Sequence, residues 1–140
     1  MDVVNQGLEK ELFEHLKTTV ANAPIYQLLG IEAQLLGAGY AELRLVATQG
    51  HTNPLGIIHG GITCFIADGA MGNAIRGLGV NGVTVDFSNA FTAAAQVGDT
   101  IVAQGKGLKA GKHMIYAEAY VYSGEKLIGH CKGTFLRTTD

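Results

Sequence analysis

Cysteine is scarce in this sequence of 140 residues, which contains only Cys64 and Cys131. Each lies inside an apolar run, and neither belongs to a Cys-x-x-Cys motif or to a cysteine and histidine spacing that is typical of zinc sites. His51 and His59 also have no third ligand at a recognisable spacing. We therefore expect two buried free thiols and no metal site.

The sequence also lacks a run of positive charge. Its ten lysine and arginine residues are dispersed and the net charge is −2, so a nucleic-acid partner is not expected. No stretch approaches the roughly 18 uncharged apolar residues of a membrane span, and residues 1–7 lack the basic and apolar regions of a secretion signal. We expect a cytoplasmic protein that binds neither nucleic acid nor a membrane.

Apolar residues, by contrast, are plentiful. Hydrophobic residues make up 47% of the chain and charged residues 16%, which is the profile of a globular protein. A chain of 140 residues can bury one core of ordinary size and is too short for two. We therefore expect a single domain over residues 1–140.

Two segments have helical periodicity. Over residues 6–18, apolar side chains recur at helical spacing with charged side chains on the other side, which predicts an amphipathic helix. Over residues 59–77 the apolar positions cover more than one stripe, which predicts a longer helix that is mostly buried. Between them, residues 25–29 fit one short helical turn that Gly30 ends.

The remaining apolar stretches alternate or flank turns, as strands do. Gly129, Cys131 and Gly133 share one face of the last strand and leave room for a thick apolar element, which only the helix of residues 59–77 can provide. The order of elements predicts an α+β fold in which an antiparallel sheet wraps around one long central helix. We expect strands over residues 31–36, 40–46, 83–91, 100–108, 113–123 and 126–137.

Alternation also assigns side chains to the two faces of the sheet. In residues 83–88, the odd-numbered positions should face one way and the even-numbered positions, which include Thr84 and Asp86, the other. In residues 113–123, one face carries apolar and aromatic side chains. If this face is the outer face of the sheet, we predict that another subunit covers it. The apolar and aromatic side chains on that face are Met114, Tyr116, Tyr120 and Tyr122.

The segment of residues 53–61 reads Asn-Pro-Leu-Gly-Ile-Ile-His-Gly-Gly and ends at the predicted start of the central helix. Two glycines at a helix N-terminus disfavour the helix, so Gly60 and Gly61 indicate that something needs close approach to the backbone there. Free backbone N–H groups at that end, with the helix dipole behind them, suit a developing oxyanion. The alternative is a glycine pair needed only for tight packing of the helix.

A second candidate lies two helical turns further on. Asp68 is a carboxylate in the middle of a predominantly apolar helix, which is unfavourable unless the group is paired, exposed or used. It is therefore either solvent-facing or salt-bridged, or it is a general base or nucleophile. Gly60 and Asp68 are eight residues apart, about 12 Å along a helix, so one helix cannot place both on one carbonyl. If both act on the same carbonyl, they come from different subunits and the protein is at least a dimer.

Together the two motifs resemble those of a known family. The pattern Asn-x-x-Gly-x-x-His-Gly-Gly followed by Ala-Asp-Gly-Ala is similar to that of the hotdog-fold acyl-CoA thioesterases. The likeness is to the phenylacetate-degradation (PaaI-like) branch of the 4-hydroxybenzoyl-CoA thioesterase superfamily. It runs from about residue 31 to the C-terminus and includes residues 82–87, 97–100 and 133–135. The resemblance implies a hotdog fold and hydrolysis of acyl-CoA thioesters that carry an aryl or medium-chain acyl group.

The resemblance also implies roles for individual residues. Asp68 corresponds to the catalytic carboxylate, and Gly60 to the residue whose backbone N–H polarises the thioester carbonyl. Asn53 matches a polar residue that helps to position the nucleophilic water or the thioester, and Thr84 matches a hydroxyl near the carboxylate. His59 matches the histidine before the glycine pair, whose role is to orient the loop.

Other positions are implied to contact coenzyme A, which is part of the substrate rather than a separate cofactor. The turn of residues 109–112 resembles one that lies along the CoA moiety, and its last lysine would face a phosphate. Residues 91–95 depart from the family because they lack the proline that is common there. The resemblance further implies a homotetramer built from two dimers. The positions expected to contact CoA are Lys109, Ala110, Gly111, Lys112, Asp86 and Phe91.

Two other functions fit parts of the sequence. A hotdog protein could bind acyl-CoA or a similar ligand without turnover, although a pure binder would not need a carboxylate near the thioester. A hotdog dehydratase would need a catalytic histidine beside the acid, and His59 lies in the wrong motif for that. His113 and His130 lie on predicted strands without an acidic neighbour of matching phase, so we expect structural or surface histidines there.

Overall fold

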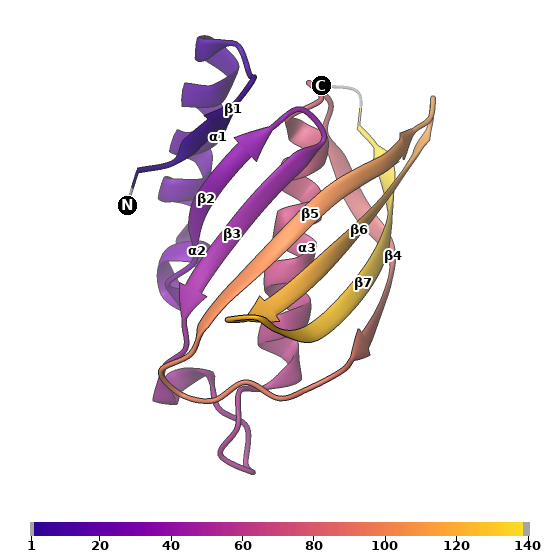
Figure 1. Cartoon of the computed structure of the whole chain (residues 1–140). Helices are drawn as coiled ribbons and strands as arrows, with labels where there is room; N and C mark the ends of the chain where they lie inside the picture. Colours follow the sequence, from indigo (N-terminus) through magenta and orange to yellow (C-terminus); the bar gives the residue numbers. More distant parts are fainter. Residues whose placement is uncertain (1, 139–140) are drawn as a thin grey trace.

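The computed structural model describes residues 2–138, in which one curled sheet wraps around a long helix, α3 (Gly60–Arg76) (Figure 1). Helices α1 (Lys10–Asn22) and α2 (Pro24–Leu29) lie beside the end of the sheet that holds β1 and β2. None of these helices is long and apolar enough to cross a membrane. The strand order is β1-β2-β3-β5-β6-β7-β4, which is antiparallel apart from the β1–β2 pair. The strands are β1 (Val4–Gln6), β2 (Glu32–Gly37), β3 (Tyr40–Val46), β4 (Gly82–Phe91), β5 (Thr100–Ala110), β6 (Met114–Ser123) and β7 (Lys126–Arg137).

The first helix begins and ends later than residues 6–18, the range that the sequence predicts. Residues Val4–Gln6 form β1 instead, and this strand pairs in parallel with β2. Gly7 then turns the chain with a φ of +86°, and the Asn5 side chain bonds to the backbone N–H and C=O of Leu8. The predicted start was wrong because Leu8 fits the apolar stripe but lies in this turn.

The packing of α3 on the sheet forms the core. On β6 the small and branched side chains share the inner face, as the sequence predicts, and all of them are buried. Glycines on the neighbouring strands let α3 come close: a Cβ built at Gly105 of β5 would lie 2.3 Å from the carbonyl carbon of Ala70. At Gly129 and Gly133 of β7 an added Cβ would instead meet side chains of α3, Thr63 at 2.8 Å and Met71 at 2.9 Å. The inner-face residues of β6 are Ile115, Ala117, Ala119 and Val121.

A buried histidine connects the loop after β3 to the end of α2. This loop contains a short 3-10 helix, Gln49–His51. The His51 Nδ1 accepts a hydrogen bond from the backbone N–H of Thr48 (2.9 Å), and its Nε2 donates to the backbone C=O of Leu29 (2.9 Å). Gly30 takes the left-handed conformation (φ +78°) and ends α2 as predicted. The loop and α2 therefore hold each other in place.

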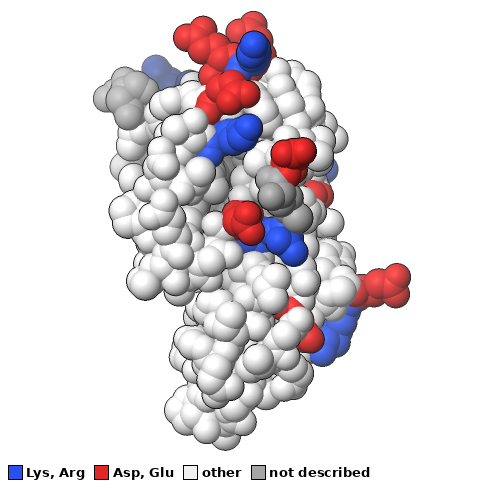
Figure 2. All heavy atoms as spheres, turned by 90° about the vertical axis from the view of Figure 1, so that its left-hand side faces the viewer, with Lys and Arg blue, Asp and Glu red and all other residues white. Residues whose placement is uncertain are grey.

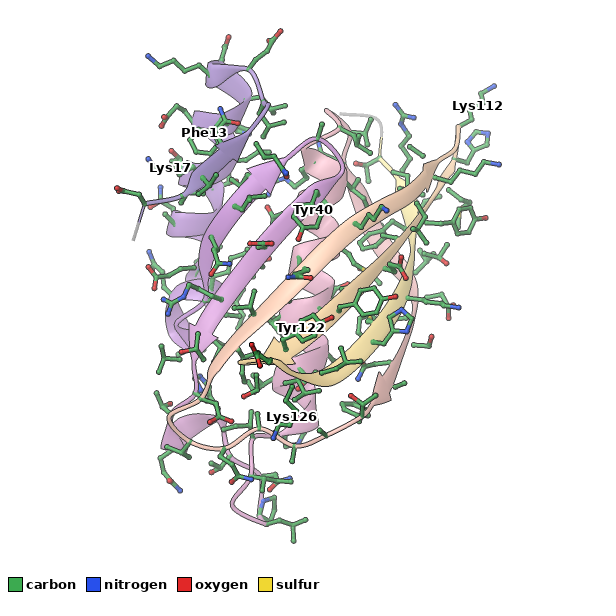
Figure 3. The ribbon with its side chains drawn as sticks, viewed as in Figure 1. Phe13, Lys17, Tyr40, Lys112, Tyr122 and Lys126 are labelled. Carbon is green, nitrogen blue, oxygen red and sulfur yellow. The ribbon has the colours of Figure 1, made fainter. Side chains whose placement is uncertain are left out.

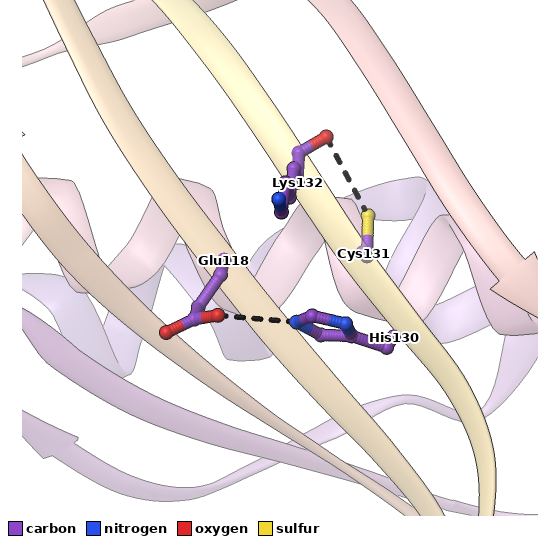
Figure 4. A network of polar contacts seen from close by, with 4 residues as sticks. All are labelled: Glu118, His130, Cys131 and Lys132. Atoms are coloured by element: carbon purple, nitrogen blue, oxygen red, sulfur yellow. Dashed lines mark hydrogen bonds and ion pairs between the residues drawn. The ribbon is translucent and has the colours of Figure 1, made fainter.

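The outer face of the sheet carries exposed aromatic side chains. Tyr116 and Tyr120 of β6 are 44% and 37% exposed, which agrees with the predicted alternation. His130 is a partly exposed surface histidine, as expected, but it does have an acidic neighbour, because its Nε2 lies 3.1 Å from the Glu118 carboxylate (Figure 4). Its ring also stacks on Tyr120. Glu118 is paired with Lys132 in the β6–β7 register, so it meets His130 on the diagonal. The phase of one strand does not reveal such a diagonal contact.

The close approach of α3 to β5 predicts a position that tolerates no side chain. Replacing Gly105 by alanine would force a methyl group onto the backbone of α3, so we expect the free energy of unfolding to fall by about 1–3 kcal/mol or more. Gly107→Ala on the same strand is the matched control, because a Cβ there would meet only ordinary contacts at 3.6 Å and beyond. Urea denaturation of the two variants measures the difference. Equal stabilities would contradict this account of the packing.

Candidate active site

Asp68 lies in the middle of α3 and is half-buried. The Thr84 hydroxyl of β4 donates a hydrogen bond to the Asp68 Oδ1 at 2.7 Å. No lysine, arginine or histidine within residues 2–138 forms an ion pair with this carboxylate. One structural explanation for Asp68 was a salt bridge. The described part of the chain contains none at this carboxylate. One oxygen is held by Thr84 and the other is left for a further partner.

A β-bulge in β4 brings Thr84 to the carboxylate. Thr84 is paired with Phe135 and Asp86 with Thr134, so Val85 is an extra residue between them. Simple alternation would put Thr84 and Phe87 on opposite faces, and that prediction was wrong. The bulge turns both toward α3, where they line the same pocket, whereas Asp86 lines a depression on the outer face of the sheet.

The pocket around Asp68 is almost wholly apolar and has a volume of about 340 Å³. Two aromatic rings and one thiol surround the Asp68 carboxylate and the Thr84 hydroxyl. Cys64 is only half-buried, contrary to the prediction of two buried thiols, because it faces this pocket one turn before Asp68. Burial raises the pKa of the Cys64 thiol, so it stays uncharged at neutral pH. The lining residues are Gly61, Cys64, Phe65, Asp68, Thr84 and Phe87.

The start of α3 has a free backbone donor. The His59 Nδ1 caps the helix by accepting a hydrogen bond from the Gly61 N–H at 2.7 Å. The Gly60 N–H has no acceptor among residues 2–138. The Phe91 ring lies over Gly60, where an added Cβ would be 2.9 Å from its Cε1 atom, so close packing alone would already favour glycine here. The N–H remains an unused donor at the positive end of the helix dipole.

Asn53 lies beside this helix start and orders the loop before it. Its Oδ1 accepts hydrogen bonds from the backbone N–H groups of Leu55 (2.9 Å) and Ile57 (3.3 Å). These bonds leave its side-chain NH₂ group as a possible donor. Asn53, Gly60 and Phe91 line one pocket of about 320 Å³, which is separate from the pocket around Asp68. One chain therefore holds the expected site residues in two groups on different parts of α3.

The turn expected to lie along CoA is at the opposite end of the molecule from the loop before α3 (Figure 3). Strand β5 continues through Lys109 and Ala110, so the turn itself is shorter than predicted and contains Gly111 and Lys112. Lys112 lines a depression of about 370 Å³ together with His113 and Arg137. Arg137 was not among the expected site residues because it is distant in sequence, and only the pairing of strand ends brings it here.

Metal ligation has no support in the described part of the chain. Within residues 2–138, no group of three histidine, cysteine, aspartate or glutamate side chains lies close enough to hold a metal ion. His51 uses both ring nitrogens in bonds to the backbone, and His59 uses Nδ1 to cap α3. The candidate site instead supplies the half-buried carboxylate of Asp68 and the Gly60 N–H, which has no acceptor among residues 2–138.

Comparison with known proteins gives matches over the segment that carries these residues. The family described as the thioesterase superfamily matches residues 55–129. A protein of Archaeoglobus fulgidus named "Putative esterase" is 30% identical over 120 residues, which cover 85% of this chain and 78% of that protein. "Acyl-coenzyme A thioesterase 13" of Mus musculus is 36% identical over 69 residues, which cover 48% of this chain and 49% of that protein.

Solved structures match the fold. The PaaI protein from the phenylacetic acid degradation operon of E. coli has a TM-score of 0.88 at 21% identity, covering 95% of this chain and 97% of its own. A hypothetical thioesterase of Streptococcus pneumoniae, solved with coenzyme A, has a TM-score of 0.75 at 20% identity, covering 79% of this chain and 90% of its own. At such identities the likeness concerns the fold alone, and it confirms the predicted hotdog arrangement.

Proposed function

The chain belongs to the thioesterase superfamily, and from that premise we propose that it hydrolyses acyl-CoA thioesters to a free acid and CoA. The observation that carries this proposal is Asp68, the one carboxylate that lines an otherwise nearly apolar pocket. The name of the mouse relative and the coenzyme A in the pneumococcal structure support CoA esters as the substrate class.

In this proposal Asp68 acts on the thioester as a general base or as a nucleophile. The Thr84 hydroxyl fixes one carboxylate oxygen at 2.7 Å, which leaves the other to take a proton from water or to attack the carbonyl carbon. In the first case the water oxygen bonds to the carbonyl carbon, the C–S bond breaks, and the proton that Asp68 took from water passes to the sulfur, so CoA leaves as the thiol. In the second case the Asp68 oxygen bonds to the carbonyl carbon, the C–S bond breaks to give an acyl anhydride and CoA, and water then hydrolyses the anhydride to the free acid and restores Asp68.

The carbonyl oxygen is proposed to bind at the start of α3. The Gly60 N–H lies at the positive end of the helix dipole and is unused among residues 2–138, so it suits the negative charge that develops on this oxygen. The His59 cap and the Asn53 Oδ1 bonds hold this backbone in shape. The Asn53 NH₂ group is then free to donate to the thioester or to the attacking water.

We infer that each site is shared between subunits. Gly60 and Asp68 line separate pockets of one chain, so the carbonyl must lie between Gly60 of one subunit and Asp68 of another. Large apolar side chains near the loop and α2 support burial in such a contact: Leu55, Leu28 and Ile25 are 83%, 78% and 44% exposed. The lower part of the face in Figure 2, at the height of this loop, is also uncharged. A homo-oligomer, at least a dimer, follows from this sharing, and we propose a tetramer because the family resemblance implies one.

The CoA phosphates are proposed to bind at the turn after β5. Lys112 and Arg137 contribute two positive charges to one depression, with His113 between them. Such clusters suit phosphate groups, which arginine and lysine recognise by charge-assisted hydrogen bonds. Phe91 would contact the substrate beside Gly60. Asp86 lies on the outer face of the sheet and is not part of the proposed site.

The role of Asp68 is tested by release of free CoA thiol from a panel of aryl- and alkyl-CoA esters. We expect Asp68→Asn to lower kcat by about 100-fold or more, because the amide cannot accept a proton or attack the carbonyl. Glu125→Gln, which changes an exposed carboxylate in the β6–β7 turn, is the control. Full activity of Asp68→Asn would contradict the assignment. Acyl-CoA binding without turnover in the wild type would favour a non-catalytic binding protein instead.

The shared site predicts complementation between two inactive variants. Gly60→Pro removes the proposed N–H donor at the first position of α3, a position whose backbone suits proline, and should cost about 100-fold in kcat. Gly60→Ala, whose Cβ meets the Phe91 ring in the same way but keeps the N–H, is the matched control and should lose much less activity. Mixed dimers of Gly60→Pro and Asp68→Asn subunits, isolated with two affinity tags, contain one intact site. We expect them to regain roughly half of the wild-type activity. Mixed dimers as inactive as either parent would show that both groups act within one subunit.

The phosphate site is tested with a truncated substrate. Lys112→Ala should raise KM about fivefold for an acyl-CoA, since an exposed ion pair is worth up to about 1 kcal/mol. It should leave KM unchanged for the same acyl group on pantetheine, which lacks the phosphates. Lys10→Ala on α1 controls for the loss of a surface charge. Equal effects on both substrates would place the CoA phosphates elsewhere.

A further inference from the structure

Tyr26 of α2 packs against α3 directly behind the Asp68 pocket. Its ring meets the Phe65 ring edge-on, with centroids 5.9 Å apart and an interplanar angle of 88°. Its hydroxyl lies over Gly69, where an added Cβ would be 2.7 Å from the hydroxyl oxygen. The Asn73 side-chain NH₂ group lies 3.5 Å from the same oxygen. Phe65, Gly69 and Asn73 follow one another at four-residue intervals and form one stripe of α3, which Tyr26 covers.

The two rings separate two hollow regions of the molecule. Phe65 lines the Asp68 pocket on one side. Tyr26 lines, on the other side, a cavity of about 380 Å³ between α1, α2 and β2, here called the α1–α2 cavity. This cavity opens on the face shown in Figure 2, and its wall is largely apolar with Lys17 and Glu32 among its lining residues. Its apolar lining residues include Val3, Val20, Ala21, Ile31 and Ala33.

The position of Tyr26 is fixed by several contacts. Helix α2 starts at Pro24 and ends at the left-handed Gly30, and His51 holds the backbone C=O of Leu29 at 2.9 Å. Burial raises the pKa of the Tyr26 hydroxyl, which therefore stays neutral. The Asn73 NH₂ group that approaches this hydroxyl is itself held by the Gly69 C=O at 2.9 Å. The Tyr26 ring therefore lies between Phe65 and the α1–α2 cavity.

We propose that Tyr26 is a specificity-determining residue, which closes the Asp68 pocket against the α1–α2 cavity through its contact with Phe65. The inference rests on the proposed function in one respect, because it takes the Asp68 pocket as the place of the acyl group. Tyr26 then limits the length of that group. Short or compact acyl groups fit against Phe65 and Phe87, whereas a long alkyl chain would need the space that the Tyr26 ring blocks.

The test measures binding of S-alkyl-CoA thioethers, from propyl to dodecyl, by isothermal titration calorimetry. Thioethers cannot be hydrolysed, so the result does not depend on turnover. In Tyr26→Leu we expect the Kd of the dodecyl compound to fall about tenfold relative to that of the propyl compound, as one or two buried methylenes would produce. Tyr26→Phe keeps the ring and should retain the wild-type preference. Phe65→Leu removes the other ring that separates the Asp68 pocket from the α1–α2 cavity. It replaces Tyr26→Leu in this test if that variant does not fold.

Two controls separate added space from a loosened protein. Tyr40→Leu removes a half-buried tyrosine ring from β3, away from both hollow regions, and should leave the preference unchanged. Adding Ala21→Phe to Tyr26→Leu refills the α1–α2 cavity and should abolish the gain for the dodecyl compound. Reversal by this second change would show that the chain enters that cavity.

The outcomes distinguish this inference from the proposed function. Thioether binding with the expected shift, but no hydrolysis of the corresponding esters, would contradict the thioesterase proposal and support the role of Tyr26. A different outcome is that the esters are hydrolysed while the ratio of the dodecyl to the propyl Kd is the same in the wild type, Tyr26→Leu and Phe65→Leu. That result would overturn the role of Tyr26 and leave the thioesterase proposal standing. A gain that Ala21→Phe does not reverse, or no thioether binding by the wild type, would also overturn it.

Discussion

The close contact between α3 and the sheet is the constraint on which the rest of the structure depends. Gly105 has no space for a side chain because the backbone of α3 at Ala70 occupies it, and Gly129 and Gly133 of β7 leave room for the α3 side chains Thr63 and Met71. Close packing of this kind fixes the rotation of the helix about its axis. The face with Ala70 and Met71 must lie on the centre of the sheet, so Asp68 points toward the edge strand β4. The orientation of the proposed catalytic carboxylate is thus a consequence of core packing.

The edge strand β4 supplies the side chains that lie opposite Asp68 in its pocket. It pairs with β7 on one side only, and most of its side chains are exposed in a single chain. An edge strand can accommodate an extra residue more easily than a central one, because only one ladder of hydrogen bonds is interrupted. The bulge at Val85 turns Thr84 and Phe87 to the same side, so a hydroxyl and an aromatic ring both reach the pocket of Asp68. A regular strand would supply one of them but not both.

The proposed chemistry is divided between the first turn and the middle of α3. The first turn offers the Gly60 N–H, which has no acceptor among residues 2–138, while Asp68 lies two turns later in a different pocket. In our proposal a single chain therefore carries two half-sites rather than one whole site. If the site is shared as we propose, oligomer formation is a condition for catalysis. The same helix also contacts Tyr26 through Phe65, which connects the shape of the pocket to α2 and, through His51, to the loop before α3.

The sequence by itself determined the elements that depend on local pattern. Apolar periodicity predicted α3, alternation predicted the strands and their inner residues on β6, and the motif around Gly60 and Asp68 indicated the family. Only the tertiary structure decided what depends on register between strands or on contacts distant in sequence. These include the bulge that redirects Thr84, the diagonal contact of Glu118 with His130 and the approach of Arg137 to Lys112. The physical reason is that local preferences act over one or two turns of chain, whereas register and pocket shape result from packing the whole core at once.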